Sequence, residues 1–389
     1  MRVLHIITTL AEGGAEHQLR LLVSRLPQDC EVVTLSRPGA VAAAMRADGT
    51  TVHEVITTRD RDLSAVIKLR RLIRLGQFDV VHTHLYRACL QGRFAARLAG
   101  VRHVVATEYH LSGDGGARTL YLIGESLGQL TIAASEPIAD RLRAHGVPDS
   151  RITVIPKAID AAEFRYDPAL RAAARKRLGI GPEVRVIGGV GRLEPGKRFD
   201  RLIRAVGEVP EAILLLVGDG SARPALERLA AIEGVADRVT FAGAVGHARE
   251  MLCAMDVFAS PSDEDTFGLV VLEALACGLP ALYAVCPPLQ ELAAKRSAVD
   301  GAERLSPHDR ESLPRKLRAE LLCFEERRGA RLPARSAGAR YDAAELAASV
   351  GQLYERMAGG RSPLRLGTRE QSSITRRNDA KRRRRRSAR

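Results

Sequence analysis

Short apolar runs alternate with amphipathic helical segments along this chain, and the alternation occurs twice, before and after a break at residues 165–182. In the break, Pro168, Gly179, Gly181 and Pro182 surround a charged helical segment. Alternating strands and helices are typical of parallel sheets, because the return to a parallel strand needs a crossover helix. We therefore predict an α/β protein with two Rossmann-like domains whose parallel sheets face an interdomain cleft.

The predicted elements fall into two groups that correspond to the two domains. Strands are expected at 2–7, 31–35, 51–55, 79–83, 103–107, 130–133 and 152–155, and then at 184–190, 212–217, 238–242, 256–259 and 280–284. Helices are expected at 15–26, 63–75, 88–99, 199–206 and 341–357. We place a first domain at 1–170, a second at 183–340, a last helix at 341–358 and a basic tail at 359–389. A chain of 389 residues is long enough for two hydrophobic cores.

Much of the positive charge is concentrated at the end of the chain. The formal net charge is +14, and residues 359–389 contribute +10 of it through 12 basic and 2 acidic residues. A segment with this charge and few large apolar side chains is predicted to be disordered. Such a tail could bind nucleic acid, anionic lipid or another acidic partner, or be a solvated terminus with no specific partner. Nucleic acid is disfavoured, because the rest of the chain carries no recognisable nucleic-acid-binding motif.

A second basic region covers residues 59–102, with 10 Lys or Arg against 3 acidic residues. Its predicted helix at 63–75 places Leu63 and Ile67 beside Lys68. A basic amphipathic surface of this kind could rest on an anionic membrane. The alternative is an ordinary surface helix that covers the sheet, so peripheral membrane contact stays open.

The composition favours a cytoplasmic protein, at most peripheral at the inner face of the plasma membrane. Six cysteines are scattered without a Cys-x-x-Cys pair, which predicts a reducing compartment, no disulfides and no zinc site. The opening residues are expected to form a strand and not a signal peptide. The apolar stretch 269–289 raises the question of a membrane span, but Glu273, Gly278 and Pro280 interrupt it. We predict a helix, a turn and a strand there instead.

Residues 261–280 combine a polar loop with an apolar helix that contains one carboxylate. Asp265 lies in the loop, and Glu273 follows eight residues later among Leu, Val and Ala. A helix that is apolar all round is normally buried, and a buried carboxylate needs hydrogen-bond donors or a cation. The ribose hydroxyls of a nucleotide would be suitable donors, and a buried arginine is the alternative. The helix entry also offers backbone N–H groups that could cradle a diphosphate, those of Thr266, Phe267, Gly268 and Leu269.

A glycine-rich turn joins the predicted strand 184–190 to the predicted helix 199–206. Glycines such as Gly191 permit close approach of the backbone to a ligand. Arg192 and Lys197 in this turn could neutralise a diphosphate. A glycine-rich turn between a strand and a helix is weak evidence when it stands alone.

The first domain has two further candidate features. Gly13 and Gly14 follow the first strand and precede Glu16 at a helix start, where partial positive charge favours phosphate. The alternative for these glycines is a simple helix start. His82 and His84 end a strand and point the same way if it is extended. They suggest donor-site histidines or a satisfied strand end, because no third ligand for a metal is evident.

Together these features resemble glycosyltransferase family 4, whose members are retaining enzymes with the GT-B fold. The Glu-x7-Glu signature of that family stands here as Asp265-x7-Glu273, and its Gly-Arg-Leu-x-x-x-Lys element stands at 191–197. The resemblance implies that Asp265 contacts hydroxyls of the donor sugar and that Glu273 binds the ribose. Arg192 and Lys197 would hold the leaving diphosphate. Aspartate is one methylene shorter than glutamate, which leaves the identity of the sugar open.

The resemblance also implies roles for residues outside these two motifs. Asp219 would lie near the nucleotide and Gly243 near its base, with the element at 13–16 at the interdomain cleft. The family often has a histidine in a Thr-x-His context near the donor sugar. Here Tyr109 fills that place and His110 follows it, so His110 is a catalytic candidate displaced by one residue. The last helix would cross back onto the first domain.

We therefore predict a metal-independent retaining glycosyltransferase that moves a sugar from a nucleotide-diphosphate sugar, such as a UDP-sugar, to a hydroxyl acceptor. No cofactor is expected besides this donor substrate. The acceptor would be a carbohydrate or a lipid-linked molecule, in the biosynthesis of a polysaccharide, glycolipid or glycoconjugate. Two alternatives stay open: a GT-B sugar-nucleotide epimerase, and a nucleic-acid-binding protein that uses the arginine-rich tail.

Overall fold

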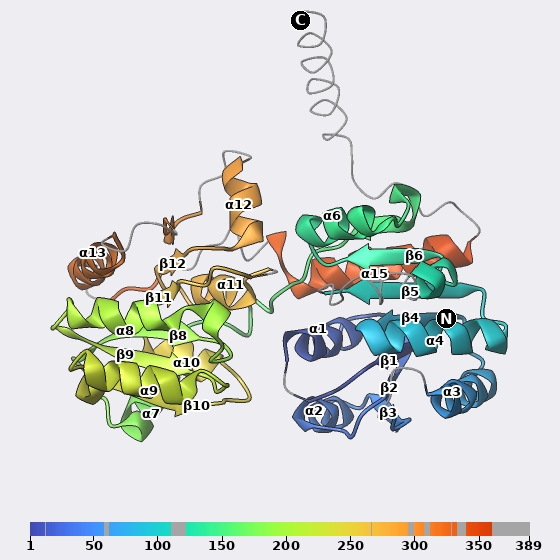
Figure 1. The fold of residues 1–389 in the computed structure, drawn as a ribbon, viewed down its shortest axis with the longest axis horizontal. Coiled ribbons are helices and arrows are strands. Elements are labelled where there is room, and N and C mark those ends of the chain that lie inside the picture. The colour runs from blue at the N-terminus through green and yellow to red at the C-terminus, as the bar shows by residue number, and fades with distance from the viewer. Residues whose placement is uncertain are drawn as a thin grey trace, which may run out of the picture.

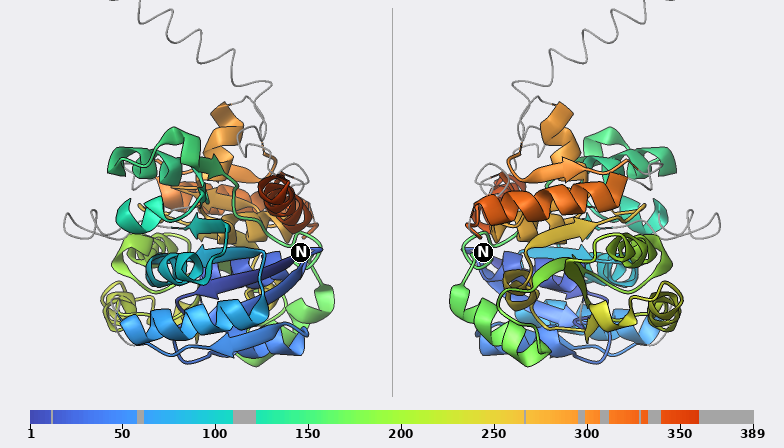
Figure 2. Two further views of the ribbon diagram at one scale, coloured as in Figure 1. Left: turned by 90° about the vertical axis from the view of Figure 1, so that its right-hand side faces the viewer. Right: turned by 90° about the vertical axis from the view of Figure 1, so that its left-hand side faces the viewer.

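Two parallel α/β domains lie side by side in the computed structural model of the chain (Figure 1). The structure describes residues 1–11, 13–57, 62–109, 122–265, 267–294, 299–306, 312–327, 329–332 and 340–359. Helices lie on both faces of each sheet (Figures 1 and 2), so the central strands are buried on both sides. The predicted α/β class with two Rossmann-like parallel sheets is confirmed.

The first domain is built on a seven-stranded parallel sheet in the order β3-β2-β1-β4-β5-β6-β7. Its strands are β1 (Arg2–Ile7), β2 (Asp29–Thr34), β3 (Thr51–Glu54), β4 (Val80–His84), β5 (His103–Glu108), β6 (Leu130–Ala133) and β7 (Ile152–Val154). Its helices include α1 (Gly14–Val23), α2 (Ala40–Ala47), α3 (Leu63–Gly76), α4 (Tyr86–Ala99) and α6 (Glu136–His145). The strand order reverses between β1 and β4, and the crevice at such a point is the usual ligand site of an open α/β sheet.

The second domain is built on a six-stranded sheet in the order β10-β9-β8-β11-β12-β13. Its strands are β8 (Arg185–Val190), β9 (Ala212–Val217), β10 (Val239–Gly243), β11 (Val257–Ser260), β12 (Ala281–Tyr283) and β13 (Ala302–Arg304). Its helices include α7 (Pro168–Leu178), α8 (Phe199–Gly207), α9 (Arg223–Ile232), α10 (Arg249–Ala254), α11 (Leu269–Ala276), α12 (Pro287–Ala294) and α13 (Ser312–Glu326). The sequence did not predict β13, because this short edge strand is largely exposed and has no apolar run.

The last helix, α15 (Ala343–Ala358), belongs to the first domain although the second domain precedes it in the chain (Figure 1). Its buried side chains pack in one apolar cluster with Val3 of β1 and Val80 of β4. Beside it, the amide of Ile159 donates to the carbonyl of Tyr341, and the amide of Ala343 donates to the carbonyl of Ile159. The two passages of the chain between the domains are therefore hydrogen-bonded to each other.

In the described part of the chain, no helix is long and apolar enough to cross a membrane. The apolar stretch 269–289 folds into α11, a turn, β12 and the beginning of α12. Gly278 ends α11 with a φ of 73°, a conformation that suits glycine.

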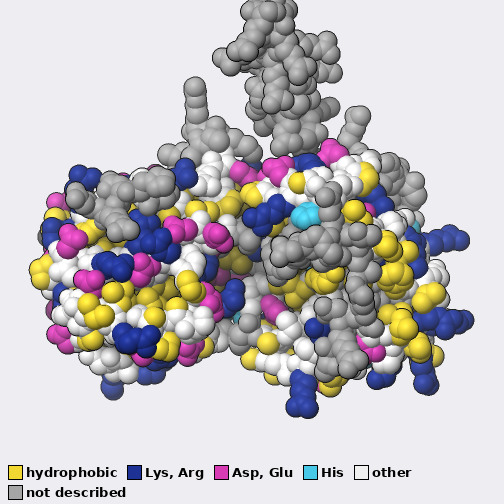
Figure 3. Space-filling view, viewed as in Figure 1, with side chains coloured by type: hydrophobic (Ala, Val, Ile, Leu, Met, Phe, Trp, Pro, Cys, Tyr) yellow, Lys and Arg dark blue, Asp and Glu magenta, His cyan; other side chains and the backbone are white. Residues whose placement is uncertain are grey.

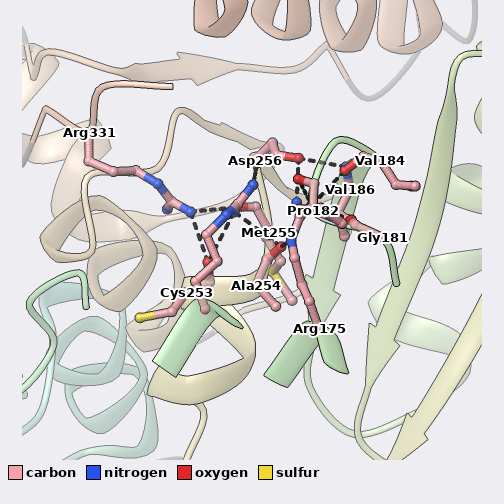
Figure 4. A network of polar contacts seen from close by, with 11 residues as sticks. Arg175, Gly181, Pro182, Val184, Val186, Cys253, Ala254, Met255, Asp256 and Arg331 are labelled. Carbon is pink, nitrogen blue, oxygen red and sulfur yellow. Dashed lines mark hydrogen bonds and ion pairs between the residues drawn. The ribbon is translucent and has the colours of Figure 1, made fainter. Parts of the chain in front are cut away.

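A buried ion network ties α7 to the sheet of the second domain (Figure 4). Asp256, just before β11, accepts hydrogen bonds from Arg171 at 2.6 Å and from Arg175 at 2.9 Å. The same carboxylate accepts from the amide of Val186 at 2.8 Å. Arg175 also donates to backbone carbonyls at the end of the domain break and in the second domain, those of Gly181, Pro182, Val184 and Ala254. The network holds the linker that enters the second domain.

Replacing Asp256 with asparagine is expected to destabilise the second domain by about 3 kcal/mol, because Arg175 is then buried without an anion. Thermal unfolding of the full chain measures the effect. The matched control is Glu250→Gln, which breaks a surface pair with Arg177 and should leave the melting temperature unchanged. Equal melting temperatures for the two variants would contradict a stabilising role of the network.

Candidate active site

Three glycine loops meet at the carboxyl edge of the second sheet. The amide of Gly191 after β8 donates to the carbonyl of Val217 at the end of β9, and the amide of Gly218 donates to the carbonyl of Gly243 after β10. A Cβ atom on Gly218 would lie 1.9 Å from the carbonyl oxygen of Gly191. Only glycine fits there, because the backbones of these loops pack directly against each other. Asp219 lies on it, and its carbonyl accepts from the amide after Arg192.

Asp265 connects the glycine-rich turn to the beginning of α11. Its Oδ2 accepts a hydrogen bond from Lys197 Nζ at 2.8 Å. Its Oδ1 accepts from the amides of Phe267 at 3.0 Å and Gly268 at 2.7 Å. Burial opposes ionisation of Asp265, but Lys197 and the two amides outweigh it and hold the pKa of this carboxyl below its usual value. The ion pair places Lys197 at the N-terminus of α11.

This geometry corrects one expectation about the diphosphate cradle. The amides of Phe267 and Gly268 are bound to Asp265 and are not open to a ligand. The next amides, those of Leu269 and Val270, belong to the first turn of α11, where helix geometry leaves N–H groups without intrahelical acceptors. Among the described residues, the amides that can receive an anion are therefore that of Leu269, which was predicted, and that of Val270, which was not.

A cavity of about 600 Å³ lies between the two domains (Figure 3). From the second domain, α11 contributes Leu269, Val270 and Glu273 to its wall. The first domain contributes residues of α1, and the passage between the domains contributes residues 158–160. The described cavity thus joins the beginning of α1 to the beginning of α11.

Glu273 lines this cavity between the domains. Among the described residues, no side chain forms an ion pair or hydrogen bond with Glu273, so the alternative of a buried arginine partner is wrong within that part of the chain. Burial, reinforced by the charge of Glu163 across the cavity, raises the pKa of Glu273 to about 7. A ligand that donates hydrogen bonds to this carboxylate would relieve the cost of its ionisation.

The cations predicted for the donor site differ in their surroundings. Lys197 is half-buried and paired with Asp265, whereas Arg192 is exposed beside the glycine loops. A third cation, Lys157, was missed from the sequence. It follows β7, and its Nζ lies 5.6 Å from the ring centroid of Tyr109 and 5.8 Å from that of Phe267. Tyr109 and Phe267 belong to different domains, so Lys157 lies between them.

Burial lowers the pKa of Lys157 to about 8, with Asp265 raising this pKa and Lys197 lowering it. Both charges act on Lys157, so it belongs to the same electrostatic cluster as the Lys197–Asp265 pair. The available signal in the sequence was weak, since a single lysine after a strand is normally an exposed side chain.

The glycine element of the first domain lies against α11. A Cβ atom on Gly14 would be 3.9 Å from Leu269, and one on Gly13 would collide with the carboxylate of Glu16. Gly13 therefore leaves room for the Glu16 carboxylate within the first domain, whereas Gly14 lies within ordinary contact distance of the second domain. Gly14 lines the cavity, whereas Glu16 is buried behind the loop.

His82 and His84 are buried inside the first domain and do not line the cavity between the domains. The sequence suggested no third metal ligand, but His5 on the neighbouring strand completes a cluster, with its Nδ1 3.1 Å from Nε2 of His84. Both nitrogens of His82 contact hydroxyls, those of Tyr354 at 2.5 Å and Thr107 at 2.7 Å. Burial lowers the pKa of His5 to about 3 and keeps it neutral. We interpret the cluster as a hydrogen-bonded support between the sheet and α15.

Two candidates predicted from the sequence, His110 and Thr266, lie outside the described residues. The structure therefore gives no position for either side chain.

Asp263, whose spacing to Asp265 imitates a metal-binding Asp-x-Asp pair, forms an ion pair with Arg198. Each of these two carboxylates has its own basic partner, which does not favour a shared cation.

The fold and the cavity define the class of the protein: two Rossmann-like domains with a cavity between them, the arrangement of GT-B glycosyltransferases. Solved structures with this fold include Anabaena HepE in complex with UDP-glucose, with a TM-score of 0.76. That structure is 22% identical in sequence, and the match covers 91% of this chain and 99% of the HepE chain. A glycosyltransferase of Rickettsia africae has a TM-score of 0.77 at 13% identity, covering 92% of this chain and 98% of the other.

The family models identify the chain more closely. A model described as Glycosyltransferase Family 4 matches residues 12–163, and one described as Glycosyl transferases group 1 matches residues 184–319. The chain belongs to this family of glycosyltransferases and is a transferase. The D-inositol 3-phosphate glycosyltransferase of Mycolicibacterium gilvum is 29% identical over 77% of this chain and 72% of the relative. That of Mycobacterium tuberculosis strain F11 is 31% identical over 57% of this chain, which spans half of the relative's length.

The raised pKa of Glu273 predicts a stability difference that depends on pH. In the unfolded chain this carboxyl ionises near 4.5, but in the folded chain it keeps its proton to about 7. The unfolded state is therefore favoured progressively between these values, and the full penalty applies above the higher one. Glu273→Gln should raise the free energy of unfolding by about 2 kcal/mol at pH 8. The gain should shrink as pH falls toward 5, which denaturant unfolding at the two pH values measures. A gain of equal size at both would contradict this ionisation.

Proposed function

We propose that this glycosyltransferase transfers a sugar from a nucleoside-diphosphate sugar to a hydroxyl acceptor with retention of the anomeric configuration. The observation that carries the proposal is the pair of acids on α11 and its entry loop. Asp265 accepts hydrogen bonds from Lys197 and two amides, whereas Glu273 lines the cavity unpaired in the described part of the chain. One acid orients a cation, and the other is available for hydroxyl groups.

The proposed donor lies along the beginning of α11. Glu273 accepts hydrogen bonds from the ribose hydroxyls, which replace the missing partners of its buried carboxylate. The diphosphate lies at the N-terminus of α11, near Lys197 and Arg192, where amides and charge favour an anion. Complexes of HepE with UDP and with UDP-glucose support a nucleotide sugar as the donor class.

In the proposed reaction, the bond between the anomeric carbon and the diphosphate oxygen breaks while the acceptor oxygen approaches from the same face. The sugar passes through an oxocarbenium-like state, and the proton of the acceptor hydroxyl goes to the departing diphosphate. Lys197, Arg192 and the α11 amides stabilise the charge that develops on the leaving group. These basic groups replace a metal ion in the proposed mechanism, so no metal is needed.

The acceptor is proposed to enter from the first-domain wall of the cavity. This wall carries His17 and two arginines whose charges are already paired, Arg20 with Asp48 and Arg25 with Asp160. Polar side chains without a large excess of charge suit the hydroxyl groups of a carbohydrate. A lipid-linked sugar presents the same chemistry, and the polysaccharide, glycolipid or glycoconjugate pathway stays unassigned.

Lys197→Ala is expected to lower turnover of a UDP-sugar with a carbohydrate acceptor by about 10²–10³, the usual effect of removing one group that stabilises developing charge. Product formation from a panel of UDP-, GDP- and TDP-sugars measures it. Lys316→Ala is the matched control, because in the described part of the chain Lys316 pairs with Glu303 at the surface and with the carbonyl of Arg304. Normal turnover in Lys197→Ala would refute the proposed leaving-group site.

Further measurements separate this function from its alternatives. An epimerase converts the donor when no acceptor is present, whereas a transferase only hydrolyses it slowly. A nucleic-acid-binding protein loses its activity when the tail arginines at 382–386 become glutamine, and a transferase does not.

Turnover should persist in EDTA, and loss of activity that manganese restores would refute metal independence.

Lys157→Met is expected to lower turnover by about 10²-fold at pH 7, because it keeps apolar contact with the Tyr109 and Phe267 rings but removes a cation from the cluster. With its pKa lowered to about 8, Lys157 is charged below that pH and neutral above it. Activity of the natural chain should therefore decline above about pH 8. In Lys157→Arg the decline should move to higher pH, because arginine keeps its charge. An unchanged alkaline limb in this variant would contradict the role of Lys157.

A further inference from the structure

Helix α3 of the first domain exposes bulky apolar side chains to solvent. Leu63 is 76% exposed, Ile67 67% and Leu75 75%, and Leu98 at the end of the neighbouring α4 is 60% exposed. The sequence left open the alternative that this helix is an ordinary surface helix that covers the sheet. That role falls to the opposite side of α3, where Ala65, Leu69 and Ile73 are buried. The exposed apolar groups are therefore additional to what the fold requires.

Cations share the face with these apolar groups. Leu63, Ile67, Arg71 and Arg74 follow one another at helical spacing on the exposed side, with Lys68 and Leu75 at its border. Arg70 donates to the carbonyl of Leu98, which joins α3 to the end of α4. On the right-hand side of Figure 3, over these helices, Lys and Arg side chains project between apolar ones.

Anionic groups are scarce around this face. Residues 63–76 and 86–99 of α3 and α4 contain seven Lys or Arg and no Asp or Glu. Asp62, the N-cap of α3, is bound to the amide of Ser64 and the hydroxyl of Thr57. A groove of about 510 Å³ beside α3 is lined by Lys68, Arg71 and Arg2 among others, and its one carboxylate, Glu31, pairs with Arg2 and His53.

We propose that this α3 surface, made of Leu63, Ile67, Lys68, Arg71, Arg74, Leu75 and Leu98, docks the enzyme onto an anionic lipid bilayer. The apolar side chains enter the boundary between head groups and acyl chains, and the cations contact lipid phosphates. A second copy of the chain is a poorer occupant. A symmetric dimer through this face would bring two sets of like charges together.

The test is co-sedimentation of the full chain with vesicles of phosphatidylglycerol and phosphatidylcholine, compared with pure phosphatidylcholine. Binding is expected only to the anionic vesicles and should weaken as salt is added. The triple variant Leu63→Ser, Ile67→Ser and Leu75→Ser should lower the partition coefficient about tenfold or more, since it keeps every charge but loses the apolar contacts. Ile232→Ser is the matched control, because Ile232 is 81% exposed on the second domain, and it should bind as the natural chain does.

A tail variant with arginines 382–386 changed to glutamine separates the two basic regions of the chain. The proposal expects this variant to keep its sensitivity to the triple serine substitution. Vesicle binding that depends on the tail arginines and ignores the serines would overturn it. The proposal would also be overturned if the natural chain did not bind vesicles but formed a concentration-dependent dimer in light scattering, and if the triple serine variant were monomeric. Slow donor hydrolysis, unchanged in the triple variant, shows that the serines spare the fold.

Discussion

The carboxylate of Asp265 is the contact on which the donor end of the cleft depends. It accepts hydrogen bonds from the two amides that precede α11 and from the ammonium of Lys197. One side chain therefore aligns a cation with a helix N-terminus. An aspartate is well suited to this, because its short side chain can bind amides two and three residues further on. The departure from glutamate at this position therefore has a structural reason. It also means that any contact of Asp265 with a donor sugar must use lone pairs that these bonds leave over.

The cleft also depends on how the chain passes between its domains. The first passage runs through Lys157 to Ile159, and the second enters α15 beside it, with backbone hydrogen bonds joining Ile159 to Tyr341 and Ala343. Ile159 lines the cavity, and Lys157 lies between rings of both domains. The hinge region and the ligand site are thus built from the same few residues. A change in the angle between the domains would move the Lys157 cation relative to Asp265.

Periodic features of the sequence predicted the fold well. The strands β1, β6 and β9 begin and end where their apolar runs do, whereas β13 was missed because an exposed edge strand has no such run. Glycine positions were also predictable, since Gly191 and Gly218 stand where the backbone of one loop meets the next. The contacts between side chains could not be predicted in this way. No local pattern indicates that Asp265 binds its own helix, that His5 joins His82, or that Lys157 reaches the second domain, because each contact depends on tertiary packing.

The contrast between the two acids separates support from binding. A buried carboxylate that serves the fold is normally saturated, as Asp256 is by two arginines and an amide. Glu273 is more exposed than Asp256, but its carboxylate is desolvated and, in the described part of the chain, lacks such partners, so its pKa rises to about 7. The free protein bears the cost of desolvating this carboxylate, and a ligand whose hydroxyl groups donate hydrogen bonds to it would offset that cost. In the proposed function, the unpaired acid, more than the presence of the two-acid motif, is the feature that suits this cleft to a polyhydroxylated ligand.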